Sequence, residues 1–137
     1  MSFSRHSIRV AAFQALFALA TTPDAEKSEL YQTVLKLQPN EEVPAYLTTL
    51  VDGVMTNQEE IDAAIAKHLA PGWRLSRLPR PSLIILRLAT YELQEKLAPA
   101  PVVINEALEV AKDFTDEASR KFINGVLGSM TSESAPA

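Results

Sequence analysis

Two arginines near the start of the chain, Arg5 and Arg9, stand four residues apart in the run Ser4-Arg5-His6-Ser7-Ile8-Arg9. On a helix this spacing places both guanidinium groups on one face. There they can straddle neighbouring phosphates or stack on the bases of a single strand. His6 adds an imidazole that carries a third positive charge when protonated. The pattern predicts a phosphate-binding stretch, with ordinary solvated surface charge as the alternative.

A further arginine, Arg87, interrupts the otherwise apolar run over residues 83–89. A guanidinium buried among apolar side chains must be paired, because an uncompensated buried charge is strongly destabilising. We expect Arg87 to form an ion pair inside the core with Glu92, Glu106 or Asp52. Contact with a phosphate is the alternative interpretation.

The sequence lacks the patterns that common catalytic sites require. It has no GxxxxGK[ST] phosphate loop, no GxSxG nucleophile elbow and no HExxH zinc motif. Its two histidines, His6 and His68, are far apart in sequence, and its carboxylates lie at ordinary helix-surface spacings. With no cysteine there is no disulfide, thiolate nucleophile or Cys-ligated metal site. We therefore expect a protein that is not an enzyme and that uses no cofactor or metal.

Charge is distributed unevenly along the 137 residues, whose net charge is −4. By segment, the net charge is +2 over residues 1–23, −7 over 24–62, +5 over 63–91 and −4 over 92–137. The total argues against a nucleic-acid partner. However, salt screens charges beyond roughly 8 to 10 Å, so a local basic patch can still attract phosphates. The alternative is that the charges cluster by chance along solvated helix faces.

The spacing of apolar residues is helical, without the sustained alternation that predicts strands. We expect an all-α protein with helices over residues 4–20, 23–37, 44–69, 82–97, 102–114 and 116–130. Thr22 and Pro23 would open the second helix as its N-cap and first residue, and a bend at Gly53 or Asn57 could divide the third. Residues 73–81 predict a short helical turn and an extended link. The tail over 131–137 is expected to be disordered.

Length and composition indicate one soluble domain spanning residues 1–137. No apolar run approaches the roughly 18 to 20 residues of a membrane-spanning helix, so we expect no membrane partner. The start of the chain does not resemble a secretory signal. The absence of cysteine suits a reducing compartment, and we expect a cytoplasmic location.

The C-terminal half contains an ordered set of residues: Ile85-Leu86-Arg87-Leu88-Ala89-Thr90-Tyr91-Glu92-Leu93, Pro101, Val103-Ile104-Asn105-Glu106-Ala107, Ala111-Lys112, Phe114, Ser119 and Lys121-Phe122-Ile123-Asn124-Gly125-Val126-Leu127. In order and spacing these residues closely resemble the NusB family of transcription antitermination factors. The start is similar as well, with Arg5, Arg9, Ala12, Gln14, Ala15, Leu16 and Phe17, and so is the middle, with Ile61-Asp62, Ile65, Leu69 and Trp73. The resemblance covers nearly the whole chain except residues 21–45.

The resemblance implies a NusB-like fold of about six to seven helices in two small bundles packed side by side. The break at residues 70–81 would separate an N-terminal half over 4–70 from a C-terminal half over 82–130. It also implies a non-catalytic function. Proteins of this family bind boxA sequences of nascent ribosomal RNA together with NusE, a small-subunit ribosomal protein. With other Nus factors on RNA polymerase, the complex suppresses premature termination.

The resemblance further implies which residues contact each partner. Those expected to bind RNA are Ser4, Arg5, His6, Arg9, Lys112, Phe114, Ser119 and Lys121. Those expected to face NusE are Phe17, Arg80, Ser82, Ala118 and Phe122. Ser82 and Ala118 stand where relatives often have an acid, and Phe17 where many have tyrosine. Phe17 and Phe114 could also serve as stacking platforms for bases, although an aromatic residue at helical spacing is more often part of the core.

Two points stay open from the sequence. A NusB-like helical module that binds only proteins, without specific RNA binding, is the alternative function, and a homodimer is as compatible with the residues as a monomer. Arg5, Arg9 and a protonated His6 would neutralise only about two or three phosphates. We therefore expect the protein alone to bind RNA weakly, and a partner that adds contacts to tighten that binding.

Overall fold

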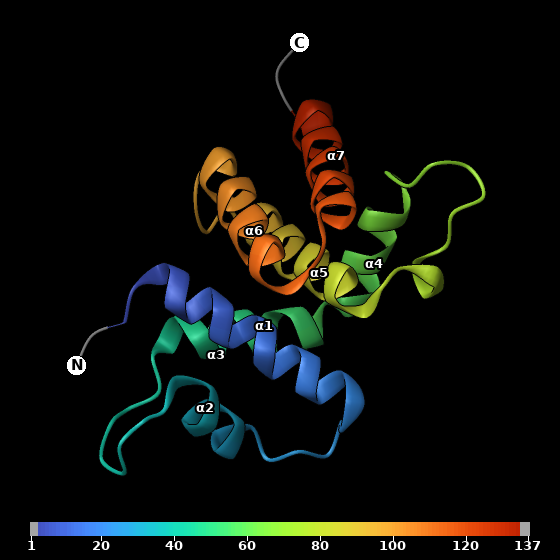
Figure 1. Cartoon of the computed structure of the whole chain (residues 1–137). Coiled ribbons are helices and arrows are strands. Elements are labelled where there is room, and N and C mark those ends of the chain that lie inside the picture. Colours follow the sequence, from blue (N-terminus) through green and yellow to red (C-terminus); the bar gives the residue numbers. More distant parts are fainter. Residues whose placement is uncertain (1–2, 135–137) are drawn as a thin grey trace.

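A computed structural model describes residues 3–134, and within this range the chain forms seven α-helices and no strand (Figure 1). This confirms the predicted all-α class. The α-helices are α1 (Arg5–Thr21), α2 (Lys27–Leu35), α3 (Ala45–Thr56), α4 (Gln58–Ala66), α5 (Arg80–Gln94), α6 (Ala100–Phe114) and α7 (Glu117–Ser134). A short 3-10 helix, η1 (Leu75–Arg77), lies between α4 and α5.

Local sequence explains where helices α1, α5 and α6 begin. Ser4 is the N-cap of α1, and its Oγ accepts a hydrogen bond from the backbone N–H of Ser7 at 3.0 Å. That bond satisfies one of the free N–H groups of the first turn. Helices α5 and α6 follow Pro79 and Pro99, and each has another proline in its first turn. Proline is favourable there because its missing N–H would have no intrahelical partner.

The second helix is shorter than predicted, and the expected start at Pro23 is wrong. The backbone N–H of Thr22 donates to the Ala18 carbonyl at 2.8 Å, so Thr22 closes α1 instead of capping α2. A turn follows, and α2 begins at Lys27. The helix ends where Lys36 adopts the left-handed conformation, with φ of 53°, a common way to stop a helix.

The long third helix is divided at Asn57 into α3 and α4. The side-chain amide of Asn57 donates to the Gly53 carbonyl at 2.8 Å, so it satisfies an acceptor at the end of α3. The backbone carbonyl of Asn57 in turn accepts from the Ile61 N–H at 2.9 Å. One residue therefore ends one helix and begins the next, and Asn57 was one of the two expected break points.

Helix α7 is longer than the sequence suggested. It continues to Ser134, so the disorder expected from Thr131 is wrong for residues 131–134, whereas 135–137 lie outside the described residues. The hydroxyl of Thr131 donates to the Gly128 carbonyl at 3.0 Å, and Met130 packs against the core. These contacts extend α7 beyond Met130, where the helical spacing of apolar residues ends.

Helix α5 is the centre of the fold and packs against α1, α3, α4, α6 and α7. Figure 1 shows α1, α2 and α3 together on one side, and α4, α6 and α7 gathered around α5 on the other. The chain passes from the first group to the second at Asn57, and the two groups pack together where α1 and α3 contact α5. Close contact between them depends on Gly53, because a Cβ there would collide with the ring of Tyr91 on α5.

The expected partners of Arg87 are wrong, although the expectation of an ion pair is confirmed. Arg87 donates through Nε and Nη2 to the two carboxylate oxygens of Asp62 on α4, at 2.8 and 2.9 Å. The candidate carboxylates are engaged elsewhere: Glu92 with Arg9, Glu106 with His6, and Asp52 with Lys27. Asp62 is the partner because α4 packs directly on α5. The sequence alone does not reveal this packing.

Candidate nucleic-acid interface

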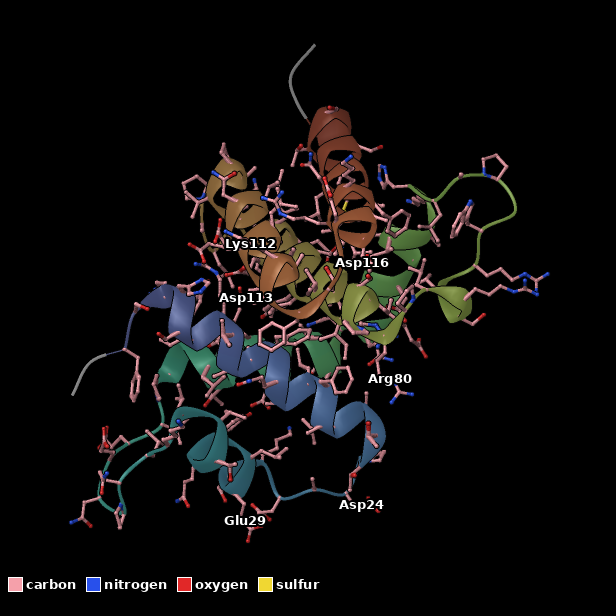
Figure 2. The ribbon with its side chains drawn as sticks, viewed as in Figure 1. Asp24, Glu29, Arg80, Lys112, Asp113 and Asp116 are labelled. Atoms are coloured by element: carbon pink, nitrogen blue, oxygen red, sulfur yellow. The ribbon has the colours of Figure 1, made fainter. Side chains whose placement is uncertain are left out.

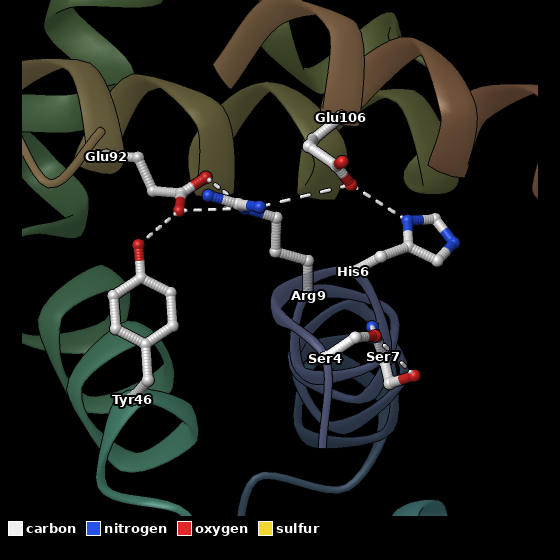
Figure 3. A network of polar contacts seen from close by, with 7 residues as sticks. All are labelled: Ser4, His6, Ser7, Arg9, Tyr46, Glu92 and Glu106. Atoms are coloured by element: carbon white, nitrogen blue, oxygen red, sulfur yellow. Dashed lines mark hydrogen bonds and ion pairs between the residues drawn. The ribbon is translucent and has the colours of Figure 1, made fainter. Parts of the chain in front are cut away.

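The side chain of Arg9 lies inside the protein, and the residue is only 5% exposed. Its Nε donates to both carboxylate oxygens of Glu92, at 3.0 and 3.2 Å. Glu92 belongs to α5, is 2% exposed, and also accepts a hydrogen bond from the Tyr46 hydroxyl at 2.6 Å (Figure 3). This Arg9–Glu92–Tyr46 network joins α1, α5 and α3.

The electrostatics of the network favour keeping it intact. Burial raises the pKa of Tyr46 to about 12, and its hydrogen bond to the Glu92 carboxylate acts in the same direction. Removing one member of a buried ion pair leaves the other charge without compensation in a poorly solvated place. Arg9, predicted to contact phosphates, is thus engaged by a carboxylate of its own chain.

Arg5 and His6 lie at the outer end of this network. Arg5 is exposed, and its guanidinium carbon is 3.7 Å from the centroid of the Tyr46 ring, which is a cation–π contact. His6 Nδ1 is 2.8 Å from Glu106 Oε2, and Arg9 Nη1 is 3.9 Å from the same oxygen (Figure 3). The predicted pair of arginines is therefore split, with Arg5 at the surface and Arg9 inside.

Helices α1 and α6 run side by side in the same direction. His6 in the first turn of α1 meets Glu106 near the middle of α6, and further along the rings of Phe13 and Phe114 lie with centroids 4.7 Å apart. The seven-residue step from His6 to Phe13 along α1 spans about 10 Å. Within the matching stretch of α6, Lys112 is exposed. We call this surface, with Arg5 and His6 at one end and Lys112 and Phe114 at the other, the α1–α6 strip.

Residues 112–121 form the corner between α6 and α7, where Figure 2 places Lys112 and Asp116. Asp116 Oδ1 accepts the backbone N–H of Ser119 at 2.8 Å, which caps the start of α7. Hydrogen bonds from the side chain and backbone of Ser119 lower the pKa of Asp116. Lys121 Nζ lies 3.7 Å from Glu117, but such an exposed pair is weak. Both lysines of the corner therefore remain at the surface.

The five residues expected to face a protein partner differ in exposure. Arg80 and Ala118 are exposed, while Phe17 and Phe122 are partly buried. Ser82 is only 1% exposed, and its Oγ has no hydrogen-bond partner among the described residues. Ser82 therefore lies beneath this surface, where the start of α5 packs into the core, and not on it.

Three residues with clear roles were missed or assigned elsewhere by sequence reasoning. Nothing in the sequence marked Tyr46 as a functional residue. It lies just beyond residues 21–45, which the family resemblance does not cover, and it looks like an ordinary helix residue. The position of Glu92 was informative. An acid directly after an apolar run is expected to be buried, and a buried charge must be paired with an opposite charge, which is the rule applied to Arg87. Trp73 is 54% exposed and stacks on Phe122, with centroids 5.9 Å apart. This exposure is unusual, because tryptophan side chains are highly buried on average.

The part of the chain that the structure describes holds no cluster of three or more His, Cys, Asp or Glu residues able to hold a metal. Its helices include none long and apolar enough to cross a membrane. The fold and site define an all-helical protein with a surface of cations and aromatic rings, of the kind that holds single-stranded nucleic acid. Comparison with known families then makes the assignment definite. The chain belongs to the NusB family, whose profile matches residues 6–132.

Relatives and solved structures agree with this assignment. The chain is 55% identical over 125 residues to the transcription antitermination protein NusB of Lacticaseibacillus casei, covering 90% of this chain and 91% of that protein. It is 49% identical over 138 residues to NusB of Lactiplantibacillus plantarum, covering 98% and 99% of the two chains. The structure of T. maritima NusB has a TM-score of 0.84 and 34% identity, covering 99% and 96%. A NusB in a crystal structure of NusB and NusE with dsRNA has a TM-score of 0.77 and 31% identity, covering 92% and 94%.

Proposed function

We propose that this protein is a non-catalytic transcription antitermination factor that binds boxA-type RNA together with NusE. The α1–α6 strip carries the proposal, because it places exposed Arg5 and Lys112 and partly exposed His6 on one surface with the aromatic ring of Phe114. Cations contact the phosphates of a single strand, and an aromatic ring stacks on its bases. The antitermination role is supported by the relatives named above.

The residues of the strip have distinct roles in this proposal. Arg5, His6, Lys112 and Lys121 contact phosphates, and Phe114 stacks on a base. Ser4 lies at the N-terminal end of α1, where hydroxyl and N–H groups suit a phosphate oxygen. Ser119, in the first turn of α7, would contact RNA by exchanging its hydrogen bonds to Asp116 for a phosphate oxygen. Arg9 contributes indirectly: through Glu92 it fixes α1, and so fixes where Arg5 and His6 stand.

NusE would bind the neighbouring surface formed by Phe17, Arg80, Ala118 and Phe122, with Ser82 supporting it from below. A similar NusB has been solved in complex with NusE and dsRNA, which supports NusE as the partner. Through NusE the complex would join other Nus factors and RNA polymerase in the cytoplasm. No step of this function requires a cofactor.

The test is fluorescence anisotropy of a labelled boxA-type RNA, titrated with the protein alone and with the protein plus NusE. A scrambled RNA of the same length and composition is the control. We expect sequence-dependent binding that tightens when NusE is present, because two sets of contacts are linked.

Two results would reject the proposal. Equal and feeble binding to both RNAs, with and without NusE, would mean that the fold serves another partner. Binding of NusE without any effect on RNA would support the alternative, a helical module that binds only proteins. Salt dependence separates the cases further, because contacts with phosphates weaken steeply as salt rises and an apolar interface hardly changes.

A further inference from the structure

The segment between α4 and α5, residues 71–79, presents an aromatic ring and two cations that the proposed function does not use. Trp73 is 54% exposed although it stacks on Phe122 of α7, at an interplanar angle of 28°. Leu75 is partly buried and Leu78 is buried, so these two side chains anchor the segment to the core. Figure 1 shows the segment reaching outward beside α4.

The two arginines of this segment are available to a ligand. Arg74 and Arg77 are exposed, and neither guanidinium forms a hydrogen bond or ion pair with any described side chain. Residues 63–91 contain no acid at all, so no neighbour in the sequence neutralises them. Unneutralised guanidinium groups beside an exposed indole are the combination that binds single-stranded nucleic acid through phosphate contacts and base stacking.

The segment is also continuous with the proposed RNA surface. Ser119 and Phe122 stand three residues apart on α7 and therefore share a face of that helix. Phe122 in turn supports the indole of Trp73. A strand lying along the α6–α7 corner would therefore reach Trp73 by continuing along one face of α7, where it would adjoin the proposed NusE surface at Phe122.

We propose that Trp73, Arg74 and Arg77 form a second contact for single-stranded RNA, in which a base stacks on the indole and the two guanidinium groups bind flanking phosphates. This inference rests on the proposed RNA binding and extends its footprint beyond the α1–α6 strip. The contact requires no particular base, because every base has a stacking face.

The chain offers a direct test, because Trp73 is its single tryptophan. Tryptophan emission then reports on this position alone, whereas the anisotropy of a labelled RNA reports binding anywhere. The probes are a boxA-type RNA and a short oligouridylate, titrated into the protein without any partner at low salt. We expect quenching of the tryptophan emission in parallel with the rise in anisotropy, because a stacked base quenches an indole.

Two variants and a matched control assign the effect. The pair Arg74→Gln and Arg77→Gln should reduce the slope of log K against log salt by about 1.4, at about 0.7 for each phosphate contact. Trp73→Leu should weaken binding by about tenfold, measured by anisotropy. The control pair, Lys36→Asn and Lys96→Asn, removes the same charge at two exposed left-handed positions elsewhere, which Asn tolerates, and should leave the slope unchanged. Circular dichroism verifies that each variant is folded.

The outcomes separate this inference from the proposed function. RNA binding without any change in tryptophan emission would overturn the inference and leave the α1–α6 strip standing. An emission change caused by NusE but not by RNA would show that the segment is a protein-binding surface, and would also overturn it. Absence of any anisotropy change with either RNA would overturn the inference, whereas the proposed function is rejected only if binding stays feeble with NusE present as well.

Discussion

Glu92→Gln should destabilise the fold strongly, because the substitution keeps the shape of the side chain and removes its charge. The guanidinium of Arg9 would then remain buried with only Glu106 near it, 3.9 Å from Nη1 and partly exposed to solvent. Breaking a buried ion pair costs about 3 to 5 kcal/mol. Since Glu106 offers some compensation, we expect about 3 kcal/mol, a large part of the roughly 5 to 15 kcal/mol that stabilises a typical domain.

Urea unfolding followed by far-UV circular dichroism measures this loss, as a lower midpoint with an unchanged slope. The matched control replaces the whole network with apolar side chains of similar volume, combining Arg9→Met, Glu92→Leu and Tyr46→Phe. Such replacements are commonly neutral or stabilising, so the triple variant should be more stable than Glu92→Gln. The reasoning is refuted if Glu92→Gln costs less than about 1 kcal/mol, or if the triple variant is the less stable of the two.

The same triple variant decides the role of Arg9 in RNA binding. If Arg9 only positions α1, the variant should bind boxA-type RNA with nearly the affinity of the native protein once both are folded. A large loss of affinity together with a lower salt slope would instead show that Arg9 leaves Glu92 to contact a phosphate. Anisotropy at several salt concentrations distinguishes the two results.

Three further predictions follow from other parts of the structure. Gly53→Ala should cost about 1 to 3 kcal/mol in urea unfolding because its Cβ would meet the Tyr91 ring, whereas Gly125→Ala, which meets nothing, should stabilise by about 0.5 to 1 kcal/mol. Burial raises the pKa of Tyr46 to about 12 in the folded state, against 10.0 ordinarily. The free energy of unfolding should therefore be unchanged up to pH 10 and fall between pH 10 and 12, because the unfolded state loses its proton first. Urea unfolding at a series of pH values should show a smaller fall for Tyr46→Phe. Arg5→Gln should lower the salt slope of RNA binding by about 0.7 and lower the unfolding midpoint only slightly, because it also removes an exposed cation–π contact with Tyr46 worth about 0.5 to 1 kcal/mol.

Helix content was largely predictable because apolar periodicity depends on local sequence. The stretches that became α1, α5, α6 and α7 were located to within a few residues. The errors fall where two helices compete for one residue. Thr22 is a good N-cap by type, yet its N–H closes α1, and sequence alone does not say which helix will use it. The packing of α4 on α5 could not be predicted from the sequence either, because it depends on tertiary contacts and not on the local pattern of residues.

The candidate site was predictable in composition but not in geometry. The spacing of Arg5 and Arg9 suggested one shared face, and the structure instead divides them between solvent and core. A buried carboxylate makes this difference, and Glu92 comes from a helix more than eighty residues away. The rule that buried charges must be paired was sound for Arg87. Applied to Glu92, the same rule would have raised the question of a buried cation such as Arg9.

The placement of acids also limits how strongly this surface can bind RNA by itself. Glu106 holds His6, Glu117 lies near Lys121, and Asp116 stands at the same corner as Lys112. Each acid lowers the local positive potential that a phosphate would meet. Arg5 and Lys112 then remain as cations of the strip without an acidic partner among the described side chains, so only a shallow salt dependence is available to the protein alone. Specific, tight binding of RNA must therefore depend on contacts added by a partner. A partner that binds the protein and the RNA together raises the affinity for RNA by thermodynamic linkage.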